Sequence, residues 1–222
     1  MGKIIAVANS KGGVGKTTLC RNLALACKLN DETVLALDCD PQKSMQNFFS
    51  QRAERLDAID IDCDVKSEAL NLKRYIQHKT ESFDRVIVDV GGRDSGALRQ
   101  VLLAAEAVII PTTTGQESTD ALEQMMEVLE DVRGVNESLQ AFLLINMVPS
   151  DVHDTTASVT AEGLKELYEN ANTTVLNSQI KQRKAWLQSA YGGFAIWEIP
   201  RGEKAAEEFN KVIDELVEKE VL

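Results

Sequence analysis

Short, almost uninterrupted apolar runs alternate along the chain with longer segments in which apolar residues recur at helical spacing. Such runs are typical of strands buried on both faces, and the longer segments are typical of helices that cover a sheet. The runs occupy 4–8, 33–38, 85–90, 107–111 and 141–147. Helices are expected over about 17–29, 43–55, 67–79, 96–104, 117–132, 156–170, 181–190 and 202–219. The alternation predicts an α/β fold in which a mostly parallel, twisted sheet is flanked by helices on both faces.

The distribution of polar residues predicts how two segments face the sheet and the solvent. The last predicted helix has Phe209, Val212, Ile213 and Leu216 at helical spacing, and Glu207, Glu208, Lys211 and Glu215 are expected on its other side, so its apolar face should pack on the sheet. Residues 56–65 alternate apolar and acidic residues, which is typical of an edge strand whose acids face water. The alternative is a metal site, although the segment lacks the glycine and the distal glutamate of a calcium loop. Its ligands would be Asp57, Asp60, Asp62 and Asp64.

Composition narrows the class of protein. The chain has 222 residues, 44% of them apolar, and no linker or repeat divides it, so we expect one domain over 1–222. The net charge of -11 predicts repulsion from nucleic acid and anionic membrane unless basic residues gather locally. No apolar stretch approaches the roughly 18 residues of a membrane span, and the four cysteines lack metal-type spacing. We therefore expect a cytoplasmic protein with reduced thiols and no membrane partner.

The stretch SKGGVGKTT, residues 10–18, follows a predicted strand and opens a predicted helix. This context is typical of a phosphate-binding loop, in which glycines turn backbone N–H groups toward a polyphosphate at a helix N-terminus. The expected nucleotide contacts come from Gly12, Gly13, Val14, Gly15, Lys16, Thr17 and Thr18. Lys16 should reach the β- and γ-phosphates, and the Thr17 hydroxyl should bind Mg²⁺.

This loop departs from the common phosphate-loop pattern because Ser10 replaces the first glycine and Lys11 follows it. KGGVGKTT resembles the deviant Walker A motif of the ParA/MinD superfamily of ATPases. The resemblance implies a P-loop NTPase fold, ATP and Mg²⁺ as cofactors, and a homodimer that forms with ATP. It also implies that Lys11 crosses the dimer interface to the partner's nucleotide and acts in catalysis with Lys16. Without the resemblance, Lys11 reads as a solvent-exposed loop lysine.

Two acidic motifs follow later strands. LALDCDPQKS, residues 35–44, resembles the second signature of that family, and Asp40 is expected to position or activate the attacking water. Asp38 is expected to support Mg²⁺ and its waters. Capping of the next helix is the alternative for Asp40. In FDRVIVDVGGRDS, residues 83–95, Asp89 ends an apolar strand, as a Walker B aspartate that holds Mg²⁺ would. Arg93 and Asp94 form either a local ion pair or part of a switch.

The base of the nucleotide has weaker candidates. Asn146 ends the apolar run 141–147, and the resemblance implies that this segment contacts adenine, although asparagine is also common in plain turns. Pro200 is expected on the other side of the base.

A local reversal of charge suggests a DNA surface. Between residues 181 and 204 there are five cations and two acids, and the segment resembles the C-terminal region of ParA proteins that binds DNA without sequence preference. The cations are Lys181, Arg183, Lys184, Arg201 and Lys204. An ordinary solvated helix face is the alternative. Trp186 and Trp197 are expected to pack in the core or an interface, and His78 and His153 to lie at the surface.

These features together predict a slow, partner-stimulated ATPase that dimerises on ATP, binds DNA non-specifically and associates with the nucleoid in that state. It would segregate or position plasmid or chromosomal DNA with a ParB-like, centromere-bound or cargo-bound adaptor. The alternative is a nucleotide-switched adaptor that positions another cargo, such as conjugation machinery, a polar assembly or a protein microcompartment. A reductase with a subunit-bridging iron–sulfur cluster is disfavoured, since no cysteine follows Cys63.

Overall fold

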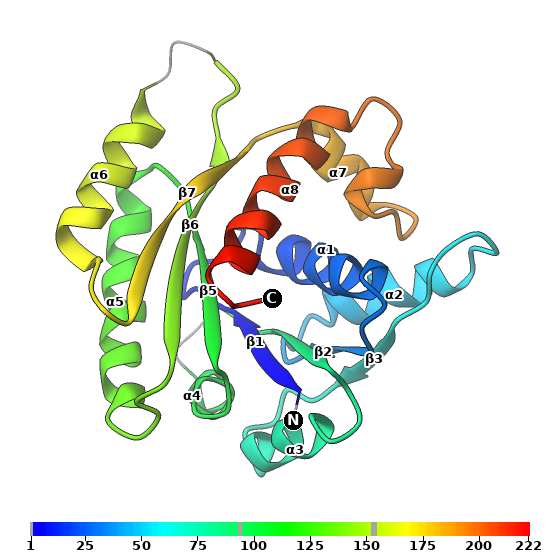
Figure 1. Ribbon diagram of the computed structural model, residues 1–222, viewed down its shortest axis with the longest axis horizontal. Coiled ribbons are helices and arrows are strands. Elements are labelled where there is room, and N and C mark those ends of the chain that lie inside the picture. The colour runs from blue at the N-terminus through cyan, green and yellow to red at the C-terminus, as the bar shows by residue number, and fades with distance from the viewer. Residues whose placement is uncertain (1, 93–94, 152–154) are drawn as a thin grey trace.

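The computed structural model describes residues 2–92, 95–151 and 155–222, and the side chains of these residues except those of 116 and 117. The predictions for Arg93, Asp94 and His153 lie outside the described residues. Figure 1 shows a central sheet with helices on both of its faces.

All pairings between the seven strands of the sheet are parallel, in the order β3-β2-β4-β1-β5-β6-β7. The strands are β1 (Lys3–Val7), β2 (Val34–Asp38), β3 (Asp62–Val65), β4 (Arg85–Asp89), β5 (Ala107–Thr112), β6 (Gln140–Val148) and β7 (Thr173–Lys181). This arrangement confirms the predicted α/β fold. The apolar runs of the sequence form the central strands because both of their faces are covered.

Alternate residues of each central strand enter two separate cores. Ile4 and Ala6 face a cluster that includes side chains of α3 (Leu72–Lys79), α4 (Gly96–Leu102), α5 (Gln116–Arg133) and α6 (Thr156–Tyr168). Ile5 and Val7 face a cluster that includes α1 (Lys16–Leu29), α2 (Ser44–Ala53), α7 (Lys184–Ala190), the 3₁₀ turn Ile196–Glu198 and α8 (Glu203–Glu218). The second layer, with α1, α2, α7 and α8, includes the elements that surround the phosphate loop.

The sequence predicts one edge strand of the sheet and misses the other. In the acidic segment only 62–65 is a strand, and it is the predicted edge strand. Asp64 is half-buried instead of facing water, because it accepts a hydrogen bond from Tyr75 Oη at 2.6 Å and pairs with Lys79 Nζ at 2.7 Å. No metal-binding cluster of His, Cys, Asp or Glu occurs among the described residues. At the other edge, β7 was not predicted, since polar residues interrupt its apolar pattern.

Helix α8 packs on the sheet as predicted, with Phe209, Val212 and Leu216 buried. Glu215, which is expected on the side of the helix opposite its apolar face, is only 8% exposed. Its carboxylate accepts backbone hydrogen bonds from Asn177 and Ser178 at 2.8 Å each. Burial alone would raise the pKa of Glu215, but these bonds outweigh it and lower the pKa. Glu215 therefore ties α8 to the edge strand β7.

Other side chains behave as expected. The rings of Trp186 and Trp197 pack against Phe209, with centroids 5.8 Å and 5.7 Å away. His78 is exposed, and the four cysteines are free thiols. Within the described ranges, no helix combines the length and the apolar character needed to span a membrane.

Candidate nucleotide-binding site

The phosphate loop lies where three parallel strands end side by side. The register places Asp89 beside both Val7 and Asp38, so the carboxyl ends of β1, β2 and β4 share one edge of the sheet (Figure 1). Residues 8–15 connect β1 to α1 at this edge. The sheet therefore brings Asp38 and Asp89 to the start of α1, at the carboxyl ends of the strands, where α/β folds bind their ligands.

The loop backbone is open on the side expected to face a ligand. Gly13 and Gly15 have positive φ values of 75° and 93°, which favour glycine, and a Cβ on Gly12 or Gly13 would meet nothing within 4 Å. A Cβ on Gly15 would instead come 2.4 Å from Asn146 Nδ2. The glycines therefore leave room for a polyphosphate and for close contact with the end of β6.

Asn146 braces the loop. Its Nδ2 donates to the Val14 carbonyl at 2.7 Å, and its Oδ1 accepts from Met147 N at 2.9 Å. One amide hydrogen of Asn146 is thus used by the loop and its oxygen by the next residue of β6, and the predicted contact with adenine stays a prediction.

Lys16 is buried inside the loop that carries it. Its Nζ donates to the Lys11 carbonyl at 2.9 Å, and a Cβ on Gly92 would lie 3.2 Å from it. Burial lowers the pKa of Lys16, although Asp89 and Asp40 oppose that change. The amine is thus held at the loop, where an incoming phosphate group could replace the carbonyl.

Thr17 and Asp89 fit a magnesium site. The Thr17 hydroxyl donates to Asp89 Oδ2 at 2.6 Å. Asp89 Oδ1 is buried and has no hydrogen-bond partner among the described residues. Burial, with the nearby charges of Asp38 and Asp40, raises the pKa of Asp89 to about 7 despite the bond from Thr17. A divalent cation that takes hydroxyl and carboxylate oxygens would satisfy this orphaned atom and its charge.

Asp38 organises the start of α2. Its Oδ1 accepts from Asp40 N at 3.0 Å, and its Oδ2 accepts from Met45 N at 2.9 Å and Gln46 N at 3.0 Å. Because both oxygens already hold backbone N–H groups, its contacts agree with support of the metal site rather than direct coordination. The bonds from Met45 and Gln46 also cap the start of α2. Asp38 thus has the capping role that was the alternative for Asp40.

Asp40 lies at the mouth of the loop. Its Oδ1 accepts from Gln42 N at 2.9 Å, and its carboxyl group would lie 3.6 Å from a Cβ on Gly91. Asp40 also lines a hollow beside the loop. This position agrees with the predicted role in orienting water, which stays a prediction.

Lys11 and Ser10 join the loop to α5. The Ser10 hydroxyl donates to the Ala121 carbonyl at 2.6 Å, and Lys11 Nζ donates to Ser118 Oγ at 3.3 Å. The serine at a glycine position of the loop pattern made Ser10 noticeable in the sequence. Ser118 could not be predicted in the same way, because its own segment contains no motif. The predicted reach of Lys11 to a partner subunit stays a prediction.

Two adjoining hollows accompany the loop. One, of about 580 Å³, is lined by loop residues, by Arg21 of α1 and by polar residues of α2. The other, of about 370 Å³, is lined largely by apolar atoms, including those of Ile180, Trp186 and Leu187. The hollows share four lining residues, Gly15, Thr18, Met147 and Ala190. Their chemistry suits the phosphates and the base of one nucleotide. Pro200 is exposed in the turn before α8 and lines neither hollow.

The predicted cationic surface carries less free charge than its five cations suggest, because one of them forms an ion pair. Arg183 pairs with Glu208, with Nη2 to Oε1 at 2.5 Å and Nε to Oε2 at 3.0 Å. Lys181, Arg183 and Lys184 also line the apolar hollow. Lys184, Arg201 and Lys204 are exposed, and they are the cations of this set that face solvent most fully. A neutralised Arg183 weakens the local charge reversal on which the DNA prediction rests.

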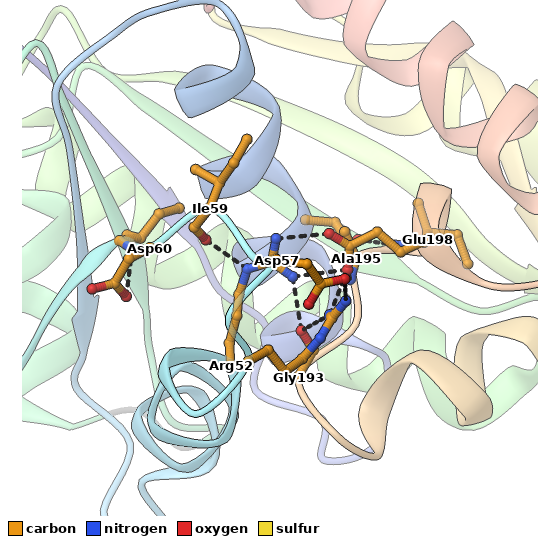
Figure 2. A network of polar contacts seen from close by, with 11 residues as sticks. Arg52, Asp57, Ile59, Asp60, Gly193, Ala195 and Glu198 are labelled. Atoms are coloured by element: carbon orange, nitrogen blue, oxygen red, sulfur yellow. Dashed lines mark hydrogen bonds and ion pairs between the residues drawn. The ribbon is translucent and has the colours of Figure 1, made fainter.

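An ion-pair network joins α2 to the segment after α7 (Figure 2). Arg52 is buried and donates to both oxygens of Glu198, at 2.9 Å and 2.8 Å, and to the carbonyls of Gly193 and Ile59, at 2.8 Å each. Arg55 adds a bond to Glu198 at 2.8 Å. We call these contacts the Arg52–Glu198 clamp. The hollow of about 580 Å³, called the phosphate-side hollow below, is lined by Gln51 of α2 and by Ala190, the last residue of α7. The clamp therefore holds α2 against the segment that directly follows this lining residue.

Comparison with known proteins identifies the class to which this fold and loop belong. Residues 5–192 match the CobQ/CobB/MinD/ParA nucleotide binding domain family. The chain therefore belongs to this family, which confirms the resemblance drawn from the loop.

Particular relatives have different roles. The chain is 25% identical over 216 residues to maintenance of carboxysome distribution protein A of Halothiobacillus neapolitanus, covering 96% of this chain and 95% of the relative. It is 28% identical over 203 residues to sporulation initiation inhibitor protein Soj of Bacillus subtilis, and this alignment covers 75% of this chain and 79% of the relative.

Solved structures share the fold. A putative plasmid partition protein of Borrelia burgdorferi bound to AMPPNP has a TM-score of 0.73 at 20% identity, over 99% of this chain and all of that one. The septum site-determining protein MinD of Pyrococcus horikoshii, complexed with Mg-ADP, has a TM-score of 0.70 at 17% identity, over 98% of both chains. The chain therefore has the nucleotide-binding ATPase fold of the ParA/MinD family.

Proposed function

We propose that the protein is a Mg²⁺-dependent ATPase that dimerises on ATP, binds DNA without sequence preference in that state, and segregates or positions plasmid or chromosomal DNA. Slow hydrolysis, stimulated by a ParB-like adaptor, would return it to the ADP form and release it from the nucleoid. The observation that carries this proposal is the double-lysine loop, in which Lys16 is buried and donates to the Lys11 carbonyl, and the Lys11 amine donates to Ser118 of α5.

The residues divide the work of hydrolysis. The loop N–H groups and Lys16 would hold the phosphates, and Asp40 would orient water toward the terminal one. Thr17 and Asp89 would hold Mg²⁺, and the bound ion would neutralise negative charge on the phosphates. The apolar hollow beside Asn146 and Trp186 would take the base. The charge of a second nucleotide across a two-fold axis would need a cation from the opposite subunit, and Lys11 is the residue proposed for it.

A second function is supported by the relatives. One of them is named for the distribution of carboxysomes, and it aligns with nearly the whole chain. A protein that positions a microcompartment, conjugation machinery or a polar assembly would use the same nucleotide switch with a different adaptor. The two proposals share ATP binding and differ in cargo and in the need for a DNA surface.

Binding to random-sequence duplex DNA tests the first proposal. We expect binding with Mg²⁺-ATP that weakens steeply as salt rises, because phosphate contacts release counterions, and little binding with Mg²⁺-ADP. Lys16→Ala, which should not bind nucleotide productively, is the control for the ATP requirement. Equal absence of binding with both nucleotides would contradict the DNA proposal and leave the cargo adaptor as the better account.

A further inference from the structure

A buried cation on the wall of the phosphate-side hollow has no acidic partner among the described residues. Arg21 lies in α1 and is 4% exposed. Its Nη2 donates to Ser189 Oγ at 3.1 Å, and its guanidinium carbon lies 4.6 Å from the centre of the Phe48 ring. Within the described part of the chain, Arg21 forms no ion pair and its buried Nε has no acceptor. The known contacts of this charge are therefore to a hydroxyl and an aromatic ring.

The direction of the side chain points to the loop. Side chains of an α-helix tilt toward its N-terminus, and residues three or four apart share a face. Arg21 follows Thr18 by three positions and Thr17 by four, so it lies on the same face of α1 as the two loop threonines. It lines the phosphate-side hollow together with them and with Lys16. The guanidinium thus borders the space expected to hold the polyphosphate.

The charge is costly while it has no counterion. Moving an ion from water into a protein interior is unfavourable unless an opposite charge compensates it. Burial accordingly lowers the pKa of Arg21 to about 10, although the more distant charge of Asp89 opposes this. Arg52 shows the contrast, because it is buried to a similar degree but donates to both oxygens of Glu198.

We propose that Arg21 is a phosphate-binding residue of the nucleotide site, and that the polyphosphate is its missing counterion. The inference rests on the proposed nucleotide binding and adds a buried cation of the same subunit to Lys16. A guanidinium suits this task because its planar donors match phosphate oxygens. In the absence of ligand, the Ser189 hydroxyl and the Phe48 ring hold the guanidinium beside the hollow.

The test compares nucleotide affinity with the stability of the ligand-free protein. Arg21→Met removes the charge at similar volume. We expect the affinities for Mg²⁺-ATP and Mg²⁺-ADP, measured by calorimetry, to fall about tenfold or more, as loss of a charged hydrogen bond predicts. The Tm of the ligand-free variant should stay equal or rise, since an uncompensated buried charge is gone. Arg21→Lys keeps a charge but loses the planar fork, so its affinity should lie between those of the wild type and Arg21→Met.

The outcomes separate this inference from the proposed function. Arg133→Met is the matched control, because that half-buried arginine donates to the carbonyls of Leu139 and Asn172 and lines neither hollow; its nucleotide affinity should not change. Wild-type affinity in Arg21→Met, or a variant that loses stability or fails to fold, would overturn the role of Arg21 and give the charge a structural role. A wild-type protein that binds neither nucleotide would instead overturn the proposed function, and the role of Arg21 with it.

Discussion

The two lysines of the loop differ in burial and in partners. Lys16 is buried and donates to the Lys11 carbonyl within the loop, whereas Lys11 is half-buried and its amine reaches Ser118 at the start of α5. A cation enclosed by the loop can act only on a nucleotide bound there. A cation at the edge can also act on a nucleotide brought by a second subunit. In the proposed dimer, loss of Lys16 should therefore reduce nucleotide binding, whereas loss of Lys11 should reduce dimerisation.

Lys11→Ala should weaken ATP-dependent dimerisation about tenfold or more and change nucleotide affinity of the monomer much less. The reason is that removal of a charge paired across an interface costs about 2 kcal/mol or more. Sedimentation with Mg²⁺-ATP measures the dimer, and calorimetry measures the affinity. Lys219→Ala, an exposed lysine after α8, is the control and should change neither. Equal dimerisation of Lys11→Ala and the wild type would contradict the interfacial role.

At the scale of elements, the Arg52–Glu198 clamp sets the position of one wall of the hollows. Residues of α2 and the end of α7 line the same hollow but do not neighbour each other in sequence, so their spacing depends on contacts such as this one. Burial alone would raise the pKa of Glu198, but hydrogen bonds from Arg52 and Arg55 lower it to about 2. The folded protein thus holds this carboxylate ionised at pH values where an unfolded chain protonates it.

The clamp should therefore weaken in acid. Because the pKa of Glu198 is lower in the folded than in the unfolded state, its contribution is complete above about pH 5 and is lost as the pH falls toward 2. After allowance for the partial exposure of Glu198, we expect its ionised form to contribute about 2 kcal/mol to the free energy of unfolding. Urea unfolding at pH 6 and pH 3 measures the larger part of this loss. Glu198→Gln should be less stable at pH 6 and should lose less on acidification. Glu218→Gln, at an exposed position of α8, should follow the wild type. The same pH dependence in Glu198→Gln and the wild type would refute the assignment.

The central strands and the acidic edge strand β3 could be predicted from sequence, and the edge strand β7 and the clamp could not. The apolar runs of β1, β2, β4, β5 and β6 follow from burial on both faces, which local sequence records directly. The edge strand β7 has polar residues such as Asn177 and Ser178, and its pairing depends on β6 and on Glu215 of α8.

Within the site, the loop and the aspartates have recognisable spacing. The positions of Arg21 and Ser118 depend instead on how α1, α5 and α7 pack, which no short motif encodes.

At the scale of the whole molecule, the distribution of charge limits how DNA could bind. The net charge is -11, and one of the five cations of the predicted surface is neutralised by Glu208. A single subunit therefore offers few free cations, and its overall field repels phosphate. An ATP-dependent dimer would present the remaining cations twice on one particle. Given the proposed ATP-dependent dimer, DNA binding that requires ATP is thus expected on electrostatic grounds.

Reversing two of the exposed cations should weaken DNA binding without affecting the nucleotide site. The variant Arg201→Glu, Lys204→Glu, whose two residues line neither hollow, should bind DNA much more weakly with Mg²⁺-ATP, because each lost phosphate contact weakens binding and lowers the slope of log affinity against log salt by about one. Its control changes net charge by the same amount at exposed cations elsewhere, as Arg74→Glu, Lys219→Glu. Fluorescence anisotropy over a salt series measures binding, and calorimetry checks that both variants retain ATP affinity. If the two variants lose affinity equally, net charge rather than a local surface governs binding, and a binding face around the start of α8 is contradicted.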